Sequence, residues 1–269
     1  GDDGVPSGCS CLDRPSGDDD DSGSSIVPDD DDSAVADDDD DSAIDDDDSS
    51  GDDDSAVVID ISEFLPPCQG GVTTAFTNDE LSPPGPDSDG YLRTSPDTLA
   101  AVANSLQALL DGDYQIALGL AALVDFELCS GEGAEYGTAL WRARPLNGGV
   151  TTGRTLFAWR SLDARPLIVG VPHPWFETNT LEQGVQAFHE LQARALIVSG
   201  THRCANSSES PCSGTTGVCG GDPGAQAYRE SDMAHMDATV YQRIHEVLSE
   251  HYSEDWVISL HGMSDDGIS

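Results

Sequence analysis

Residues 165–174 read Arg-Pro-Leu-Ile-Val-Gly-Val-Pro-His-Pro, a short and nearly continuous apolar run that ends in a histidine between two prolines. Such a run is typical of a strand that is buried on both faces. A helical pattern follows, with Thr180 and Gln183 forming a capping-box pair at its start. One face of this predicted helix carries the apolar residues Leu181, Val185, Phe188 and Leu191. The stretch therefore predicts a strand–helix unit with His173 at the end of the strand.

Two later apolar runs repeat this arrangement. Residues 195–198 lead into His202 and Arg203, and residues 256–260 lead into His261. Strands that alternate with helices predict crossover connections, and hence an α/β domain with a mostly parallel or mixed sheet flanked by helices. The carboxyl ends of parallel strands lie at one edge of a sheet, where ligands bind. We therefore expect His173, His202 and His261 to share one rim.

Three further elements are predicted from capping residues and periodicity. Ser95 and Pro96 open a helix whose apolar positions continue to Leu110, and Ser231 is expected to cap another that runs past His235 towards Leu248. Residues 155–159 indicate a strand, whereas residues 113–129 fit either a helix or a strand. The core domain is therefore expected over residues 96–269.

The chain before this domain has a different composition. Residues 1–55 hold 23 Asp and a single Arg, and they predict a disordered, Asp-rich tether because blocks of like charge cannot form a core. Residues 56–95 are rich in proline and are expected to be a linker. The chain has a net charge of −40 and no Lys, so nucleic acid and anionic membrane surfaces are poor partner candidates.

Cysteine usage indicates an oxidising compartment. Three of the seven cysteines, Cys204, Cys212 and Cys219, lie in a stretch rich in Ser, Gly and Pro without zinc-finger spacing. We expect at least one disulfide to close the loop between Cys204 and Cys219, and we expect a secreted, periplasmic or cell-surface protein. Cys9 lies among small residues and is a candidate for a lipid anchor. No apolar run approaches the ~20 residues of a membrane span.

The side chains at the predicted rim suit a catalytic metal. His173, Glu177 and His261 supply two imidazole nitrogens and a carboxylate, which are ligands typical of zinc. His235 competes with Glu177 for the third position. The alternative for each histidine is a ring that is hydrogen-bonded within its turn. Arg203, together with His202, offers donors for a substrate carboxylate, although a salt bridge within this acidic chain explains Arg203 equally well.

Three segments resemble known metallohydrolases. Residues 256–264, Trp-Val-Ile-Ser-Leu-His-Gly-Met-Ser, resemble the segment that carries the second zinc histidine in zinc carboxypeptidases and N-formylglutamate amidohydrolases. Residues 171–173 are similar to the start of the first zinc motif of those families, and residues 193–206 to the segment in which the amidohydrolases carry an arginine. The resemblance covers residues 165–264. It implies a zinc enzyme that uses metal-activated water to hydrolyse an amide bond in a small peptide or an N-acyl amino acid.

Two features depart from that pattern. Carboxypeptidases space the first histidine and the glutamate as H-x-x-E, whereas one more residue separates His173 from Glu177. Those enzymes also carry a general-base glutamate well after the second zinc histidine, whereas only eight residues follow His261. Either the domain continues beyond residue 269, or another acid acts as the base, or the protein is not an enzyme. Two other functions remain open at this point. One is a secreted, non-catalytic binding module, and the other is a metal-independent enzyme acting on a polar secreted substrate.

Overall fold

The structure is a computed structural model that describes residues 60–69, 72–76, 83–132, 135, 137–143, 155–220 and 226–262. The predicted tether over residues 1–55 and the candidate lipid anchor Cys9 lie outside these residues. Among the helices of the described part, none is both long and apolar enough to cross a membrane.

A mixed sheet of six strands forms the centre of the fold and confirms the α/β prediction. In spatial order the strands are β1 (Phe126–Ser130), β2 (Thr138–Ala143), β3 (Leu156–Arg160), β5 (Ala193–Val198), β4 (Arg165–Val171) and β8 (Trp256–Ser259). β1, β2, β3 and β5 pair antiparallel, whereas β5, β4 and β8 pair parallel. The three strands predicted to end in histidine turns are therefore neighbours that run in the same direction.

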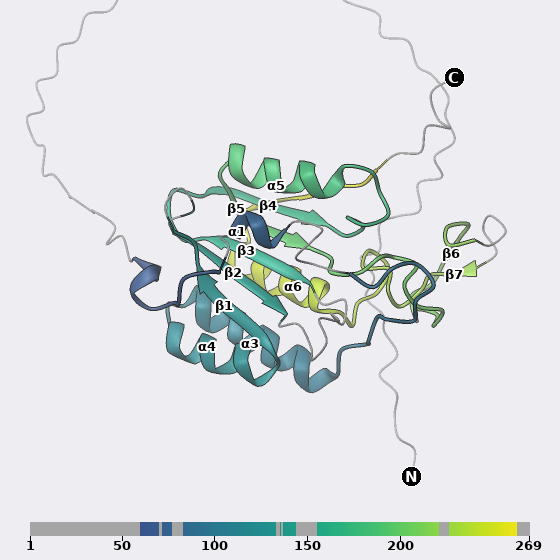
Figure 1. Cartoon of the computed structure of the whole chain (residues 1–269), viewed down its shortest axis with the longest axis horizontal. Coiled ribbons are helices and arrows are strands. Elements are labelled where there is room, and N and C mark those ends of the chain that lie inside the picture. The colour runs from purple at the N-terminus through teal and green to yellow at the C-terminus, as the bar shows by residue number, and fades with distance from the viewer. Residues whose placement is uncertain are drawn as a thin grey trace, which may run out of the picture. The chain divides into compact units, whose positions relative to one another are not determined.

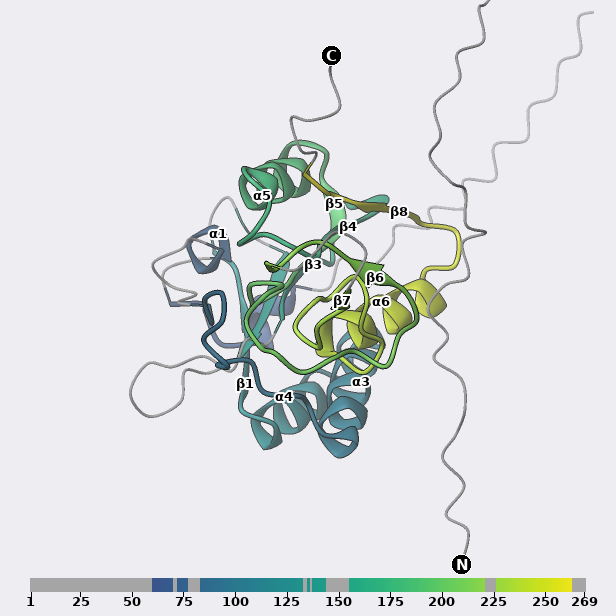
Figure 2. The same ribbon diagram turned by 90° about the vertical axis from the view of Figure 1, so that its right-hand side faces the viewer.

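Helices cover both faces of this sheet. α5 (Thr180–Glu190) packs on β4 and β5 from one side, and Figures 1 and 2 show it across the sheet from α3 (Pro96–Leu110) and α4 (Tyr114–Leu123). α6 (Val240–His251) packs against α3 and β5. The smaller elements are η1 (Ile61–Glu63), α1 (Val72–Ala75) and the hairpin of β6 (Thr215–Thr216) and β7 (Gln226–Ala227).

Alternating side chains of β5 divide the core into two layers. Ala195 and Ile197 belong to the apolar cluster shared with α3, α4 and α6. Leu196 and Val198 belong to the cluster shared with α5. Because successive side chains of a strand point to opposite faces, a continuous apolar run is what a strand covered on both sides requires. The prediction of a buried strand is confirmed here.

The third predicted strand differs from that expectation. β8 lies at the edge of the sheet, and Trp256, Val257 and Ile258 are exposed, Trp256 by 77%. The apolar run therefore identified the strand and its direction correctly, but its burial was predicted wrongly. Whether a strand lies in the middle or at the edge of a sheet depends on the order of the strands, and apolar periodicity alone does not reveal that order.

The segment predicted as a linker contributes to the domain. Of residues 56–95, Ile61, Leu65 and Phe76 are buried in the two clusters. A disulfide joins Cys68 to Cys129 on β1. These apolar residues follow neither a helical nor a strand period, so periodicity does not predict their burial.

A second disulfide, between Cys204 and Cys219, confirms the bridge predicted for the cysteine-rich loop. It encloses a short loop directly after the turn that carries His202 and Arg203. Together with the bridge on β1, it indicates an oxidising compartment.

Two helix starts differ from the predictions. Asn179, with φ of 64°, precedes α5 without a side-chain cap, and Thr180 Oγ1 donates instead to the Glu177 carbonyl. α6 begins at Val240, where the Thr239 side chain accepts from the Gln242 N–H. The predicted cap Ser231 is buried, and His235 lies in the loop before α6 rather than in its first turn. Both stretches hold several capping residues, and periodicity does not choose among them.

Candidate metal centre

His173 lies in the turn that follows β4 and is 1% exposed. The backbone N–H of Glu177 donates to the His173 carbonyl at 3.0 Å, which brings the two side chains to the same side of the turn. His173 Nδ1 lies 2.9 Å from Glu177 Oε1. On the other side of the ring, Nε2 lies 2.7 Å from Asp232 Oδ1. Both ring nitrogens of this buried histidine therefore face carboxylates.

His261 joins the same group from the end of β8. Its ring centroid lies 5.2 Å from that of His173. Its Nδ1 lies 3.4 Å from Glu177 Oε1, while the Gly262 N–H donates to Glu177 Oε2 at 2.9 Å. The parallel pairing of β4 and β8 is what carries the two turns to one rim. The predicted convergence of His173, Glu177 and His261 is thus present.

Asp232 is a member of the site that the sequence did not single out. It is 2% exposed, and Arg203 donates to its Oδ2 through Nε at 3.2 Å and through Nη2. His235 Nδ1 lies 3.1 Å from Oδ1, the same oxygen that faces His173. Asp232 directly follows Ser231, the residue that the sequence predicts as a helix cap, and the structure places it in the loop before α6. The only local signal was the histidine three residues later.

Two overlapping groups of side chains could hold a metal ion. One is His173, Glu177 and His261, and the other is His173, Asp232 and His235. In each group the candidate ligand atoms lie within 4.8 Å of one another. The four sequence-predicted ligands are therefore divided between the groups, with His173 common to both.

The surroundings favour the charged forms of His173, Glu177 and Asp232. Burial alone would lower the pKa of His173, but its hydrogen bonds with Asp232 and Glu177 outweigh burial and raise it. Burial alone would raise the pKa of Glu177, but hydrogen bonds from His173 and the Gly262 N–H hold it below its ordinary value. The pKa of Asp232 is also lowered, because bonds from His173 and His235 and the nearby Arg203 outweigh its burial. Two ionised carboxylates around His173 favour positive charge at this point.

The two predicted substrate-binding residues lie beside the centre. Arg203 is 8% exposed, and its Nη1 is 4.0 Å from Glu177 Oε1. His202 Nδ1 accepts from the Cys204 N–H at 3.0 Å, so its neutral ring carries the proton on Nε2. Burial and the adjacent Arg203 lower the pKa of His202 and favour this neutral form. Phe176 contacts both residues, because its ring packs edge-on against His202 and beneath the Arg203 guanidinium.

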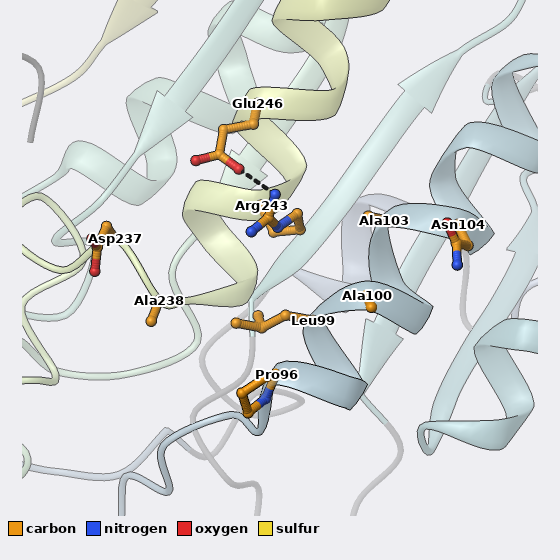
Figure 3. A pocket seen from close by; sticks show the side chains of 9 residues that line it. All are labelled: Pro96, Leu99, Ala100, Ala103, Asn104, Asp237, Ala238, Arg243 and Glu246. Carbon is orange, nitrogen blue, oxygen red and sulfur yellow. Dashed lines mark ion pairs between the residues drawn. The ribbon is translucent and has the colours of Figure 1, made fainter. Parts of the chain in front are cut away.

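A separate hollow lies between the beginnings of α3 and α6 (Figure 3). It has a volume of about 660 Å³, and Leu99, Ala103 and the paired residues Arg243 and Glu246 help to line it. None of the metal-centre residues lines it. Arg243 is the only basic residue among the described residues that line the hollow, and it is already paired with Glu246. The hollow therefore offers fewer groups for binding or catalysis than the cluster around His173.

Comparison with known proteins identifies no relative, because no family model, curated protein or solved structure matches the chain.

Proposed function

We propose that the protein is a secreted zinc-dependent hydrolase that cleaves an amide bond in a small peptide or an N-acyl amino acid. The observation that carries the proposal is the convergence of His173 Nδ1, Glu177 Oε1 and His261 Nδ1. Two neutral imidazoles and a carboxylate are a ligand set of catalytic zinc sites, which leave a fourth position open, so a bound zinc ion would displace the proton between His173 Nδ1 and Glu177.

The two distances from Glu177 Oε1 to the histidine nitrogens are compatible with a zinc ion. Ligands at about 2.0–2.1 Å from a tetrahedral zinc lie roughly 3.3 Å from one another. Glu177 Oε1 lies 2.9 Å from His173 Nδ1 and 3.4 Å from His261 Nδ1. The low pKa of Glu177 supports the proposal, because a carboxylate ligand has to be ionised.

The alternative group around Asp232 fits less well. Arg203 already compensates the charge of Asp232, because its guanidinium donates twice to Oδ2, whereas Glu177 Oε2 accepts from a neutral backbone N–H. A ligating histidine usually donates its second N–H to a carboxylate, which orients the ring. Asp232 stands in this position opposite His173 Nε2. We therefore assign His173, Glu177 and His261 as ligands, and Asp232 as the group that orients His173.

The chemistry of such a centre suits amide hydrolysis. A zinc ion held there would supply Lewis-acid catalysis, activating water near neutral pH and polarising a substrate carbonyl. The chain's own residues hold the ligands in place, and the Gly262 N–H keeps Glu177 oriented. Substrate would approach from the side of His261, whose side chain is 45% exposed, because His173 is buried. The neutral His202, whose ring packs against Phe176, keeps an N–H donor at Nε2.

The resemblance to zinc carboxypeptidases and N-formylglutamate amidohydrolases supports the substrate class, and the two disulfides support secretion. The rival function is a secreted binding module that uses the same turns without a metal. Metal content separates the two.

The test is metal analysis of the full-length chain. After incubation with zinc and removal of free ion, we expect one zinc per chain, and less than a tenth of that in His173→Ala and His261→Ala. His251→Ala is the matched control, because His251 is an exposed histidine on α6. Hydrolysis of N-acyl amino acids is then measured on the loaded proteins. A wild-type chain that retains no zinc would leave the binding module as the better function.

A further inference from the structure

Arg203 is placed where it cannot easily meet a substrate. Its side chain is buried, and it directs both Nε and Nη2 at one oxygen of Asp232. Its backbone is held as well, because Ser231 Oγ donates to the Arg203 carbonyl at 2.8 Å. The remaining guanidinium nitrogen, Nη1, points to the Glu177 carboxylate at 4.0 Å.

The contacts form a continuous series that ends at the metal centre. Arg203 holds Asp232 Oδ2, the other oxygen of Asp232 faces His173 Nε2, and the opposite nitrogen of His173 faces Glu177. An arginine that donates twice to one carboxylate limits the rotation of that carboxylate. It also compensates the negative charge that Asp232 brings into a buried position, where an unpaired carboxylate is strongly unfavourable.

We propose that Arg203 is a positioning residue for the metal centre, acting through Asp232 on the orientation of His173, and that it does not bind the substrate carboxylate. This inference rests on the proposed function, since it assigns a role within the same centre. It replaces the substrate-binding role expected from the sequence, where a salt bridge within the protein was the alternative.

A second arginine offers a matched control. Arg194 Nε donates to Asp255 Oδ2, and its guanidinium lies over the ring of Tyr252, as that of Arg203 lies over Phe176. Arg194→Met therefore removes a comparable ion pair and a comparable ring contact. Arg194 and Asp255 contact none of the proposed ligands in the described structure, so this variant reports the general cost of losing such a pair.

The experiment measures zinc affinity of the full-length protein by competition with a chromophoric chelator, together with the absorption spectrum of the cobalt-loaded form. Replacing a residue that orients a metal ligand typically weakens affinity by about 10- to 100-fold. We expect Arg203→Met to weaken zinc binding by about tenfold or more and to change the cobalt spectrum. Arg194→Met should change neither. Arg203→Lys should give an intermediate affinity, because Lys keeps the charge but cannot donate in a fork.

A double-mutant cycle tests whether Arg203 acts through Asp232. If it does, Arg203→Met should have almost no further effect on zinc affinity once Asp232→Asn is present. Equal zinc affinity and identical cobalt spectra in the wild type and both Arg203 variants would overturn this inference alone. Full additivity of Arg203→Met and Asp232→Asn would also overturn it. Should Arg203→Met not fold, Arg203→Lys decides by the same two measurements. A wild-type chain that binds neither ion overturns the proposed function, and this inference with it.

Discussion

In the described part of the chain, the buried charged residues Asp232 and Arg203 lie next to the buried His173. Burying an ionised carboxylate costs several kcal/mol unless donors compensate it. Asp232 has three such partners, namely His173, His235 and Arg203. A protein that needed only a stable core would fill this space with apolar side chains at no greater cost. The compensated charges therefore favour a functional origin for the cluster.

Outside this cluster, His245 on α6 gives a pH-dependent prediction. Burial lowers its pKa below the ordinary 6.5, so the folded state favours the neutral ring. Above pH 6.5 the ring is neutral in both states and costs nothing. As the pH falls below 6.5, the unfolded chain binds a proton first and the folded state loses stability, until the pH passes the lower folded pKa.

We therefore expect His245→Gln to lose less stability than the wild type between pH 7 and pH 5. The measurement is urea unfolding of both proteins at each pH, with His251→Gln as the control on the same helix. An equal loss in wild type and His245→Gln would show that this ring does not contribute.

At the scale of elements, the two helical glycines Gly184 and Gly119 test how closely α5 packs on the sheet. A Cβ on Gly184 would lie 2.4 Å from Val171 Cγ2, whereas a Cβ on Gly119 in α4 would have no neighbour within 4 Å. Val171 is fully buried and β-branched, so it cannot move aside easily. Overpacking costs about 1–3 kcal/mol, and Ala in place of a helical Gly contributes about 1 kcal/mol.

Gly184→Ala should therefore lower the free energy of unfolding by about 1 kcal/mol, whereas Gly119→Ala should raise it by about 0.5–1 kcal/mol. Chemical denaturation of the two variants beside the wild type measures both changes. If Gly184→Ala proved as stabilising as Gly119→Ala, α5 would lie further from β4 than the structure has it.

The sequence predicted elements where one signal was sufficient. Continuous apolar runs located β4 and β5, and Ser95 with Pro96 located the start of α3, whose cap accepts from the Thr98 N–H. The starts of α5 and α6 were wrong because several capping residues compete there. In the antiparallel half of the sheet, the strand predicted over residues 155–159 is confirmed as β3, whereas β1 lay in an ambiguous stretch and β2 had no distinctive pattern. Strand order depends on long-range contacts, which local periodicity does not encode.

The site was predictable to the extent that topology determines it. His173 and His261 follow parallel strands, so their shared rim could be inferred, and Glu177 followed from its place one turn after His173. Asp232 could not be inferred, because it lies in a loop that follows no predicted strand. No local pattern therefore indicates that it will contact His173, which is 59 residues away in the sequence. Because Asp232 was not identified, the sequence could not decide whether Arg203 binds a substrate carboxylate or forms a salt bridge within the protein.

For the molecule as a whole, the parallel half of the sheet carries the residues that could hold a metal ion, and the antiparallel half supports them. β3, the neighbour of β5, is buried along most of its length, so the centre rests on a well-packed sheet. One proposed ligand, His261, nevertheless follows the exposed edge strand β8. A bound metal would join the end of β8 to the turn after β4, and would stabilise the folded state by mass action.

The last prediction concerns the acidic segment at the start of the chain. Residues 1–55 carry a net charge of −22, and the remaining residues carry −18, so the two parts repel each other. The segment has no apolar periodicity that could pack against a negatively charged domain. Deleting residues 1–55 should therefore leave the melting temperature within about 2 °C of the full chain at 0.15 M salt, and any change should be a small increase, because repulsion is lost. Differential scanning calorimetry of both chains, each with and without zinc, measures this. A marked drop in melting temperature would mean that the segment packs on the domain and is not a tether.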